Sequence, residues 1–503
     1  MTSSVEFSTI ITFAGLFAFF IALGFYGKYW RRGNLNNPLE WSLAGRKLGT
    51  ALVFFLIGAD IYSAYSFVAV PSGVFAKGSL YFLSFPLTFG VALVTMPRLW
   101  SLSKVKGYIT ASDFIKDRFS STTLGVLIAI TGIVALLPYI ALQIVGMQSV
   151  LIVMLSGTTN SQTVGEISLL AAFVILAAFT YTSGLRGATL TAVLKDIVIW
   201  ITVIALILVV PLSVKGGFSN AFKDVKPSYV TVPSQLVSGY STLLLGSALA
   251  LFLYPHAITG VLSSESVQKL RRSIALLPLY GIGIAIMGLM GILVYAVPSA
   301  MNFLSHFPES TRGILVLPSL ILYSMPSWFA GIALLGIFIG GLVPAAIMAM
   351  SQANLLTRNI IKEIRPNTSA ISEIRITKIS STIFKFVALG FVFATPGTYA
   401  ISLQLLGGLL ITQILPAVFF GLYVKSLRKE PLIAGLLVGV FSGIFMVEST
   451  NHFGALTSSL FSIPIFGPLY IAVIALTFNL IISFGGSFFM NRNKSSLLQT
   501  KRW

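Results

Sequence analysis

Cysteine is absent from the chain, and charged side chains are scarce. None of the 503 residues is cysteine, and only 9% are Asp, Glu, Lys or Arg. The first absence excludes disulfides, thiolate metal sites and cysteine nucleophiles. The second argues against a soluble protein, because ordinary globular domains carry about a quarter charged residues to cover their surfaces. With 56% hydrophobic residues, the composition predicts a protein that crosses a membrane many times.

Apolar runs recur along almost the whole sequence. A helix needs about 20 apolar residues to cross the hydrocarbon core of a bilayer, and by that rule we expect an all-α protein with about thirteen spans. The run at 122–154 exceeds one span, so we expect a tilted or broken helix there. The expected spans are 8–27, 49–72, 79–100, 122–154, 165–183, 188–212, 238–262, 273–297, 326–353, 376–395, 398–424, 432–448 and 466–489.

The basic residues indicate the orientation of the chain. The net charge of +19 does not point to nucleic acid, because the Lys and Arg lie in short clusters between apolar runs. If the N-terminus is outside, 26 of the 33 Lys and Arg fall in inner loops and five in outer loops. The positive-inside rule therefore predicts a plasma-membrane protein with its N-terminus outside and its C-terminus in the cytoplasm. The longest outer loops are expected at 215–237 and 298–326.

Two of the expected spans are interrupted by residues that weaken a helix. The span at 49–72 contains the polar stretch 58–63, and the span at 238–262 contains Tyr254, Pro255 and His256. Proline removes a backbone donor, so such breaks expose peptide groups that are tolerated at membrane depth only in a cavity or inside protein. Either break alone is as readily a kink. As a pair, opening two groups of five spans that run in opposite directions, they are typical of a secondary transporter's binding site.

Ionisable side chains inside the spans form the second candidate feature. Each costs about 2.5–3.5 kcal/mol or more at the bilayer centre, so few are idle. We assign Asp60, Lys195 and Asp196 to ion coupling, and His256 to a substrate or proton role. Lys195 and Asp196 point about 100° apart around one helix, so we expect one of them to pair across to the second or tenth span. For Lys385, a structural ion pair and a functional role stay open.

Hydroxyl, phenol and amide side chains on several spans can line one cavity. Each alone is more often a hydrogen bond between helices, but together they suit a small polar solute. The expected substrate-binding residues are Ser63, Tyr65, Ser66, Tyr139, Gln143, His256 and Gln404.

Several of these segments carry a resemblance to a known family. They are 58–71, 110–119, 138–143, 183–187, 254–259, 344–348 with 355–359, and 404–408 with 413–416. From about Leu39 to Leu432, the sequence resembles the sodium/solute symporter family, and most closely its prokaryotic branch associated with monocarboxylate uptake.

The resemblance implies the leucine-transporter-type fold, with a core of five plus five helices in inverted repeats. On that fold we divide the chain into three parts. A first helix and its loop occupy 1–38, and two peripheral helices with a tail occupy 426–503. The core lies between them at 39–425, with repeats at 49–213 and 238–425.

The resemblance also implies where a sodium ion could bind. In the family, backbone carbonyls of the second span and paired hydroxyl side chains of the ninth span hold the ion. Carried over to this sequence, the carbonyls are those of Ala59 and Tyr62 on the second span and of Ala346 on the ninth. We expect no cofactor, and a sodium ion is the one bound ion that these positions could hold.

This sequence departs from the family pattern at that site. The two hydroxyl positions read Ala349 and Met350, and the nearest hydroxyl is that of Ser351. The acid usual in the family at position 192 is replaced by alanine, and a charge follows one turn later at Lys195. A sodium ion in hydrocarbon needs five or six oxygens, whereas a lysine ammonium brings its own positive charge and can release a proton when it is desolvated. Proton coupling is therefore a rival to sodium coupling.

These features predict a secondary active symporter that works by alternating access. We expect Na⁺ or H⁺ to drive uptake of a small organic solute, preferably a monocarboxylate, with a neutral amino acid such as proline or a sugar as the alternative. An enzyme would need a nucleophile–base set or metal ligands around one cavity, but the sequence has no HExxH or GxSxG motif and its three histidines are scattered. A channel would not need matched broken helices.

Overall fold

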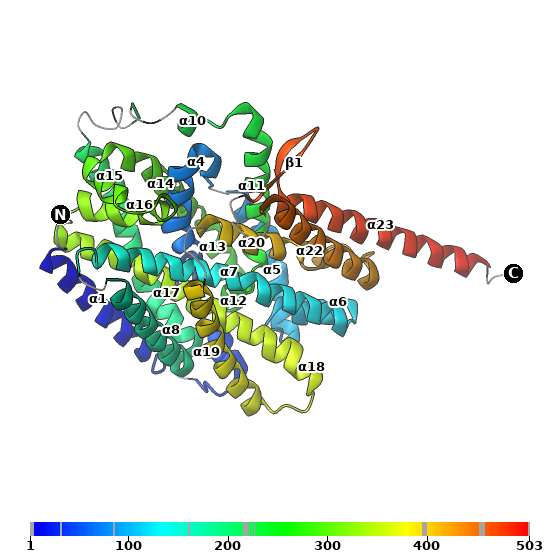
Figure 1. The fold of residues 1–503 in the computed structure, drawn as a ribbon. Coiled ribbons are helices and arrows are strands. Elements are labelled where there is room, and N and C mark those ends of the chain that lie inside the picture. The colour runs from blue at the N-terminus through cyan, green and yellow to red at the C-terminus, as the bar shows by residue number, and fades with distance from the viewer. Residues whose placement is uncertain are drawn as a thin grey trace.

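The chain folds almost entirely into helices (Figure 1). The computed structural model describes residues 5–30, 33–83, 86–158, 161–214, 220, 222–223, 225, 227–394, 400–451 and 458–500. Within these ranges the only strands are β1 (Leu460–Ile463) and β2 (Gly467–Tyr470), which pair antiparallel with Leu460 opposite Tyr470. The predicted all-α membrane class is confirmed.

The helices fall into two length classes. The long ones are α1 (Phe7–Tyr26), α5 (Leu87–Lys106), α7 (Thr122–Met154), α8 (Ser161–Ser213), α11 (Val237–Ala250), α14 (Pro278–Leu293), α16 (Glu309–Ser324), α17 (Ser327–Leu356), α19 (Ala370–Ala394), α20 (Ala400–Thr412), α22 (Lys429–Asn451) and α23 (Ile471–Thr500). The short ones are α2 (Pro38–Leu43), α3 (Thr50–Ile61), α4 (Val70–Lys77), α6 (Ala111–Phe119), α10 (Pro227–Val230), α12 (Pro255–Leu262), α13 (Val267–Leu276), α15 (Pro298–Ser305), α18 (Lys362–Ile364) and α21 (Leu415–Val418). Single 3₁₀ or π turns join them: η1 (Ala44–Arg46), η2 (Tyr65–Ala69), η3 (Gly78–Tyr81), η4 (Ser234–Leu236), η5 (Leu251–Leu253), η6 (Val294–Ala296), η7 (Thr357–Ile361) and η8 (Phe420–Leu422).

The number of spans is smaller than predicted when helices are judged by length and apolarity. Among the described residues, nine helices qualify alone, and eleven do when each of two bent pairs is counted as one span. The prediction was about thirteen. Two of the predicted spans lie in the single stretch Thr163–Leu212 of 50 residues, which is kinked at Gly184 and at about 75 Å is more than twice the bilayer core. Another corresponds to α5, whose second half carries Arg98 and Lys104.

Both predicted helix breaks are present. The α3 helix ends at Ile61, and Tyr62 leaves the helical region with φ −85° and ψ 77°. In the other span, Tyr254 is extended with φ −61° and ψ 136°, because the following Pro255 disfavours the helical conformation of the residue before it. A third break was not predicted: α20 and the segment from Leu415 meet at 48°, with a proline in the first turn of α21.

Two further segments differ from the sequence prediction. The helix α7 runs unbroken through Pro138, although the length of its apolar run also allowed a broken helix. The region 298–326, expected as an outer loop, contains α15 and α16 instead. The 16 residues of α16 are too few to cross a bilayer, but its second half is buried against α4 and α7.

The core forms around α17, which is buried along most of its length. This helix packs against α7, α8, α1 and α19, and the two broken spans lie beside it through α3 and α12. The helices α22 and α23 pack against each other at one edge, and α23 projects beyond the rest of the molecule (Figure 1). The broken helices therefore meet in the middle of the bundle, where no bulk water is available to their backbone groups.

Candidate functional site

The break after α3 is held by a lysine from α8. The Nζ atom of Lys195 donates hydrogen bonds to the carbonyl oxygens of Ala59, at 2.6 Å, and Tyr62, at 2.5 Å. It also lies 2.9 Å from Oδ1 of Asp196, and both charged side chains are fully buried. The prediction that one of the pair reaches the second or the tenth span is confirmed, with Lys195 on the second. The ammonium satisfies carbonyls that the end of the helix leaves without an intrahelical partner.

A tyrosine from α14 completes this cluster. The hydroxyl of Tyr280 donates to Oδ2 of Asp196 at 2.5 Å, and its ring packs edge-on against Tyr62 with centroids 4.5 Å apart. Two glycines make room for these rings: a Cβ at Gly58 would lie 2.0 Å from Cζ of Tyr280, and one at Gly283 would lie 1.4 Å from the hydroxyl oxygen of Tyr62. Sequence reasoning missed Tyr280, for which the only signal was a tyrosine in an otherwise apolar, glycine-rich run.

The residues at the expected sodium position do not fit a sodium ion. The two carbonyls of the second span already accept hydrogen bonds from Lys195, and Ala346 is buried in the continuous helix α17. The hydroxyl of Ser351 donates to the carbonyl of Ile347 and contacts the hydroxyl of Thr259, each at 2.9 Å. Ala349 and Met350 offer no side-chain oxygen. The positive charge at this place therefore belongs to a side chain of the protein itself.

The second charged pair joins the two broken helices directly. Nε2 of His256, in the first turn of α12, lies 2.7 Å from Oδ1 of Asp60 near the end of α3. The imidazole is enclosed by Tyr139 and Tyr254, whose ring centroids lie 5.5 Å and 5.4 Å from its own. The side chains of Asp60 and His256 are both buried.

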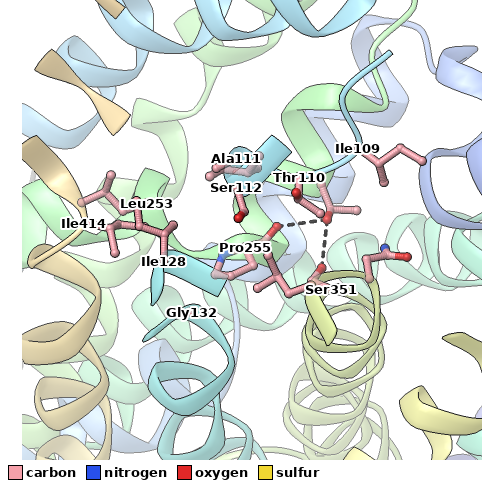
Figure 2. A pocket seen from close by; sticks show the side chains of 14 residues that line it. Ile109, Thr110, Ala111, Ser112, Ile128, Gly132, Leu253, Pro255, Ser351 and Ile414 are labelled. Atoms are coloured by element: carbon pink, nitrogen blue, oxygen red, sulfur yellow. Dashed lines mark hydrogen bonds between the residues drawn. The ribbon is translucent and has the colours of Figure 1, made fainter. Parts of the chain in front are cut away.

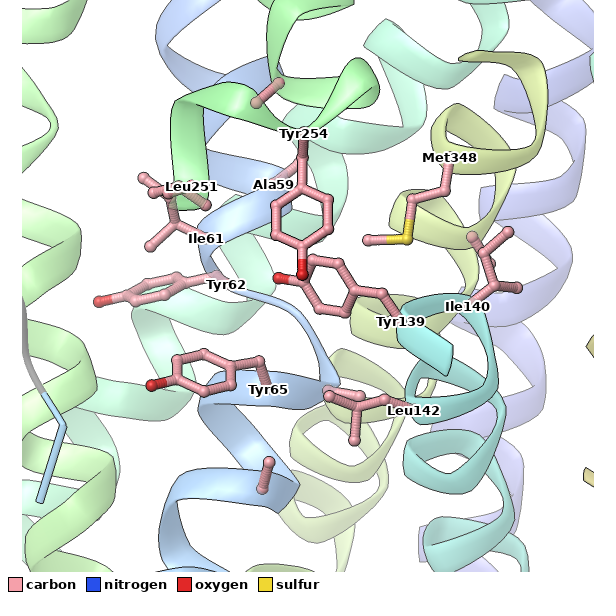
Figure 3. Close-up of a cluster of buried hydrophobic side chains, with 14 of the residues drawn as sticks. Ala59, Ile61, Tyr62, Tyr65, Tyr139, Ile140, Leu142, Leu251, Tyr254 and Met348 are labelled. Carbon is pink, nitrogen blue, oxygen red and sulfur yellow. The ribbon is translucent and has the colours of Figure 1, made fainter. Parts of the chain in front are cut away.

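A small cavity, the tyrosine cavity, is lined in part by Tyr139 and Tyr254, the two rings that enclose His256. Its free volume of about 10 Å³ is no more than one water molecule needs, so the site is closed in this conformation. Figure 3 shows Tyr139 and Tyr254 pointing toward one another beside Tyr62 and Tyr65. Polar atoms without a hydrogen-bond partner in the described part of the chain are carried by Tyr254, Gln404 and Ser247. The cavity is lined by Ile61, Tyr65, Tyr139, Ser247, Leu251, Tyr254, Ile284 and Gln404.

A second cavity, the threonine cavity, is lined in part by Pro255, Ile258 and Thr259 of α12 (Figure 2). It has a free volume of about 20 Å³, again about enough for one water molecule. Thr259 and Ser351, which both line it, are hydrogen-bonded to each other. Its walls come from 109–112 around the start of α6, from α7, α12 and α17, and from Ile414.

The N-terminal turn of α6, at the edge of the threonine cavity, is tied to the end of the α17 span. The carboxylate of Asp113 accepts hydrogen bonds from Arg358 and Asn359, each at 2.7 Å, and Thr110 donates to Asn359 at 2.8 Å. Arg358 also pairs with Glu373 of α19 at 3.3 Å. Separating α6 from α17 would require breaking this network.

The predicted substrate-binding residues divide into two groups. Tyr65, Tyr139 and Gln404 line the tyrosine cavity, and His256 lies next to it. The other three support the break in the second span: the side chain of Gln143 accepts from the amide of Ala64 at 3.0 Å, Ser66 donates to the carbonyl of Ile61 at 2.5 Å, and Ser63 accepts from the amide of Tyr65 at 3.3 Å.

Lys385 lies apart from this site. Its ammonium donates to the hydroxyls of Thr180, at 2.8 Å, and Ser381, at 3.1 Å. In the described part of the chain it forms no ion pair. The structural ion pair considered for this residue is therefore absent from those residues.

Comparisons with known proteins agree with this architecture. The model of the sodium:solute symporter family matches residues 41–439. A monocarboxylate transport permease protein of Rhizobium johnstonii is 38% identical over 89% of this chain and 90% of its own length. An uncharacterized symporter of Bacillus subtilis, YodF, is 33% identical over 86% of this chain and 88% of its own. A substrate-bound, outward-open structure of a Na⁺-coupled sialic acid symporter superposes with a TM-score of 0.76 at 15% identity, covering 97% of this chain and 98% of that one.

Proposed function

Since the chain belongs to the sodium:solute symporter family, and is therefore a cation-coupled solute symporter of the leucine-transporter-type fold rather than an enzyme, we propose that its driving cation is the proton and its solute a monocarboxylate. The observation that best supports the proton is the ammonium of Lys195, which donates hydrogen bonds to the carbonyls of Ala59 and Tyr62. By its family resemblance, this is the place where a sodium ion would bind. A side chain that supplies the charge leaves no need for the ion.

The lysine links two conditions of the transporter. When protonated, Lys195 joins the break in the second span to α8, and it shares its charge with Asp196. Lys195 then releases its proton to water on the side of the membrane with the lower proton concentration. The amine loses its charge, and its hydrogen bonds to the two carbonyls weaken. The transporter can then return to its starting conformation without the cation. Each cycle therefore moves one proton in the same direction as the solute. A group that changes charge at the break in the second span can bias the transporter between two conformations.

The choice of a monocarboxylate rests on the relative from Rhizobium and on the site itself. The tyrosine cavity has aliphatic walls from Ile61, Leu251 and Ile284, which suit a short carbon chain, and unpartnered polar atoms on Tyr254 and Gln404 within the described part of the chain. A proline-like amino acid or a sugar is the alternative. An amino acid would bring an ammonium group as well, and the buried carboxylates Asp60 and Asp196 already face His256 and Lys195.

The charge distribution supports the proposed orientation. With the N-terminus outside a plasma membrane, the basic clusters around α6 and η7 face the cytoplasm. The threonine cavity then lies on the cytoplasmic side of the charged pair and the tyrosine cavity on the outer side. Reaction of single cysteines, placed at loop positions of this cysteine-free chain, with an impermeant maleimide tests this assignment.

Uptake of labelled pyruvate into proteoliposomes tests the proposed driving cation. We expect a pH gradient, alkaline inside and imposed in sodium-free choline buffer, to drive accumulation that a protonophore abolishes. A sodium gradient at equal pH on both sides should add nothing. Uptake that depends strictly on sodium and is indifferent to the protonophore would contradict the proposal. Ohmic current in place of solute counterflow would instead identify a channel.

A further inference from the structure

The pair Asp60 and His256 is flanked along the chain by residues that line the two cavities. Asp60 directly precedes Ile61, which lines the tyrosine cavity. His256 follows Tyr254, which lines the same cavity, and precedes Ile258, which lines the threonine cavity. The pair therefore lies beside lining residues of both cavities.

The contact between the two side chains is close but incomplete. Although Nε2 of His256 and Oδ1 of Asp60 are 2.7 Å apart, their geometry is not that of a hydrogen bond. Both ring nitrogens and both carboxylate oxygens lack a hydrogen-bond partner in the described part of the chain. The exposed fractions are 2% for His256 and 4% for Asp60. Buried polar atoms without partners are rare and costly, so this pair retains capacity for a further ligand.

The backbone at His256 favours an anion as that ligand. His256 is the second residue of α12, whose N-terminus has no side-chain cap and begins with Pro255. The first amides of a helix have no intrahelical acceptor, and the positive end of the helix dipole favours negative charge. The first turn of α12 therefore has amides without an intrahelical acceptor close to the side chain of His256.

Among the residues that the structure describes, no other basic group competes for an anion at this junction. The helix α12 packs against α3 and α17, and α7 brings Tyr139 against His256. These four helices carry Asp60, Tyr139 and His256 as their only ionisable side chains. Lys195 of α8 is already bonded to two carbonyls and paired with Asp196. The basic side chains of the neighbouring α5 and α13 are exposed or half-exposed.

We propose that His256 binds the carboxylate of the transported solute, and that Asp60 is the internal anion which this carboxylate displaces. The inference rests on the proposed function, since it assumes that the solute is a monocarboxylate. Without solute, Asp60 faces His256 and keeps the two broken helices together. With solute, the carboxylate takes the donors of His256 and of the α12 N-terminus, and Asp60 is released from the contact. Because one anion replaces another, His256 has an anionic partner both before and after the solute binds.

Equilibrium binding of ¹⁴C-pyruvate to the purified full chain in sodium-free buffer tests the exchange. His256→Gln removes the basic donor and should weaken binding by about tenfold to a hundredfold, the range of one hydrogen bond to a charged group. Asp60→Asn keeps the shape but removes the competing charge, and should tighten binding by about tenfold. The double variant should bind like His256→Gln, because without His256 there is nothing for Asp60 to compete for.

Asp60→Asn also serves as the control for folding, since a misfolded protein cannot gain affinity. Lactamide, the uncharged analogue of lactate, should fail to displace pyruvate, whereas lactate should displace it. The exchange is overturned if His256→Gln binds pyruvate as the unaltered chain does, or if Asp60→Asn weakens binding. If the unaltered chain binds no short monocarboxylate, the proposed substrate and this inference both fail. If it binds pyruvate but transports it only with sodium, the proposed driving cation alone fails.

Discussion

Replacing Lys195 by methionine removes the ammonium from the break in the second span. Methionine has a similar length but no donor, so the carbonyls of Ala59 and Tyr62 lose the hydrogen bonds of 2.6 Å and 2.5 Å. Asp196 loses its cationic partner and keeps only the hydroxyl of Tyr280. The substitution therefore acts on coupling and on stability together.

The size of the stability effect follows from burial. Removing one partner of a buried ion pair costs about 3–5 kcal/mol, and each hydrogen bond from a charged donor contributes about 1.5–3 kcal/mol. The double variant Lys195→Met, Asp196→Asn leaves no uncompensated charge, so we expect it to recover a large part of that loss. Thermal unfolding in detergent should order the melting temperatures as unaltered chain, double variant, then single variant.

The functional assay separates coupling from solute movement. In proteoliposomes, both variants at Lys195 should lose pyruvate accumulation driven by a pH gradient. Counterflow of labelled against unlabelled pyruvate should persist in the double variant, because exchange needs no net proton movement. Lys385→Met is the matched control, since Lys385 is equally buried but bonds only to the hydroxyls of Thr180 and Ser381 among the described residues. It should keep gradient-driven accumulation.

Two results would refute this reasoning. If Lys195→Met accumulates pyruvate normally under a pH gradient, the ammonium is not the coupling group. If Lys385→Met fails in the same way as Lys195→Met, the loss reflects removal of any buried lysine rather than of this one.

Two further substitutions have outcomes set by the packing. Gly58→Ala places a Cβ 2.0 Å from the ring of Tyr280 and should lower both the melting temperature and gradient-driven uptake. In the control Gly90→Ala, the new Cβ meets no atom within 4 Å, so neither quantity should change. Equal effects of the two substitutions would show that the close approach at Gly58 is unimportant. Asp113→Asn weakens the network that holds the start of α6 and should speed maleimide labelling of a cysteine placed at Ala111, on the wall of the threonine cavity. An unchanged labelling rate would mean that this network does not keep the cavity closed.

The parts of the site with local signals in the sequence could be predicted. Pro255 and the polar stretch around Asp60 interrupt apolar runs, so both breaks follow from the order of the residues alone. The same holds for Lys195, because a lysine inside a span needs a partner and Ala349 and Met350 lack the oxygens that sodium would need. These facts predict that Lys195 or Asp196 reaches the second or the tenth span, but not that Lys195 is the one that reaches the second.

The parts that depend on how distant helices face one another could not be predicted. Tyr280 reaches Asp196 only because Gly58 and Gly283 let the rings approach, and these residues lie on different spans. Asp60 and His256 were each singled out, but their contact at 2.7 Å requires the two breaks to face each other. The helices α15 and α16 were not predicted because they are amphipathic and too short to cross the membrane. The division into inverted repeats at 49–213 and 238–425 stays a prediction.

The central claim is that Lys195 takes the place of a sodium ion. Its most direct test is to measure whether protons move together with the solute. Proteoliposomes containing a pH-sensitive dye are placed in sodium-free choline buffer, and pyruvate is added outside at equal pH. After subtraction of the diffusion of pyruvic acid into protein-free vesicles, we predict that the lumen acidifies with the unaltered chain and with Lys385→Met, but not with Lys195→Met. Absence of acidification by the unaltered chain, together with pyruvate-dependent uptake of ²²Na⁺ when sodium is supplied, would contradict the account.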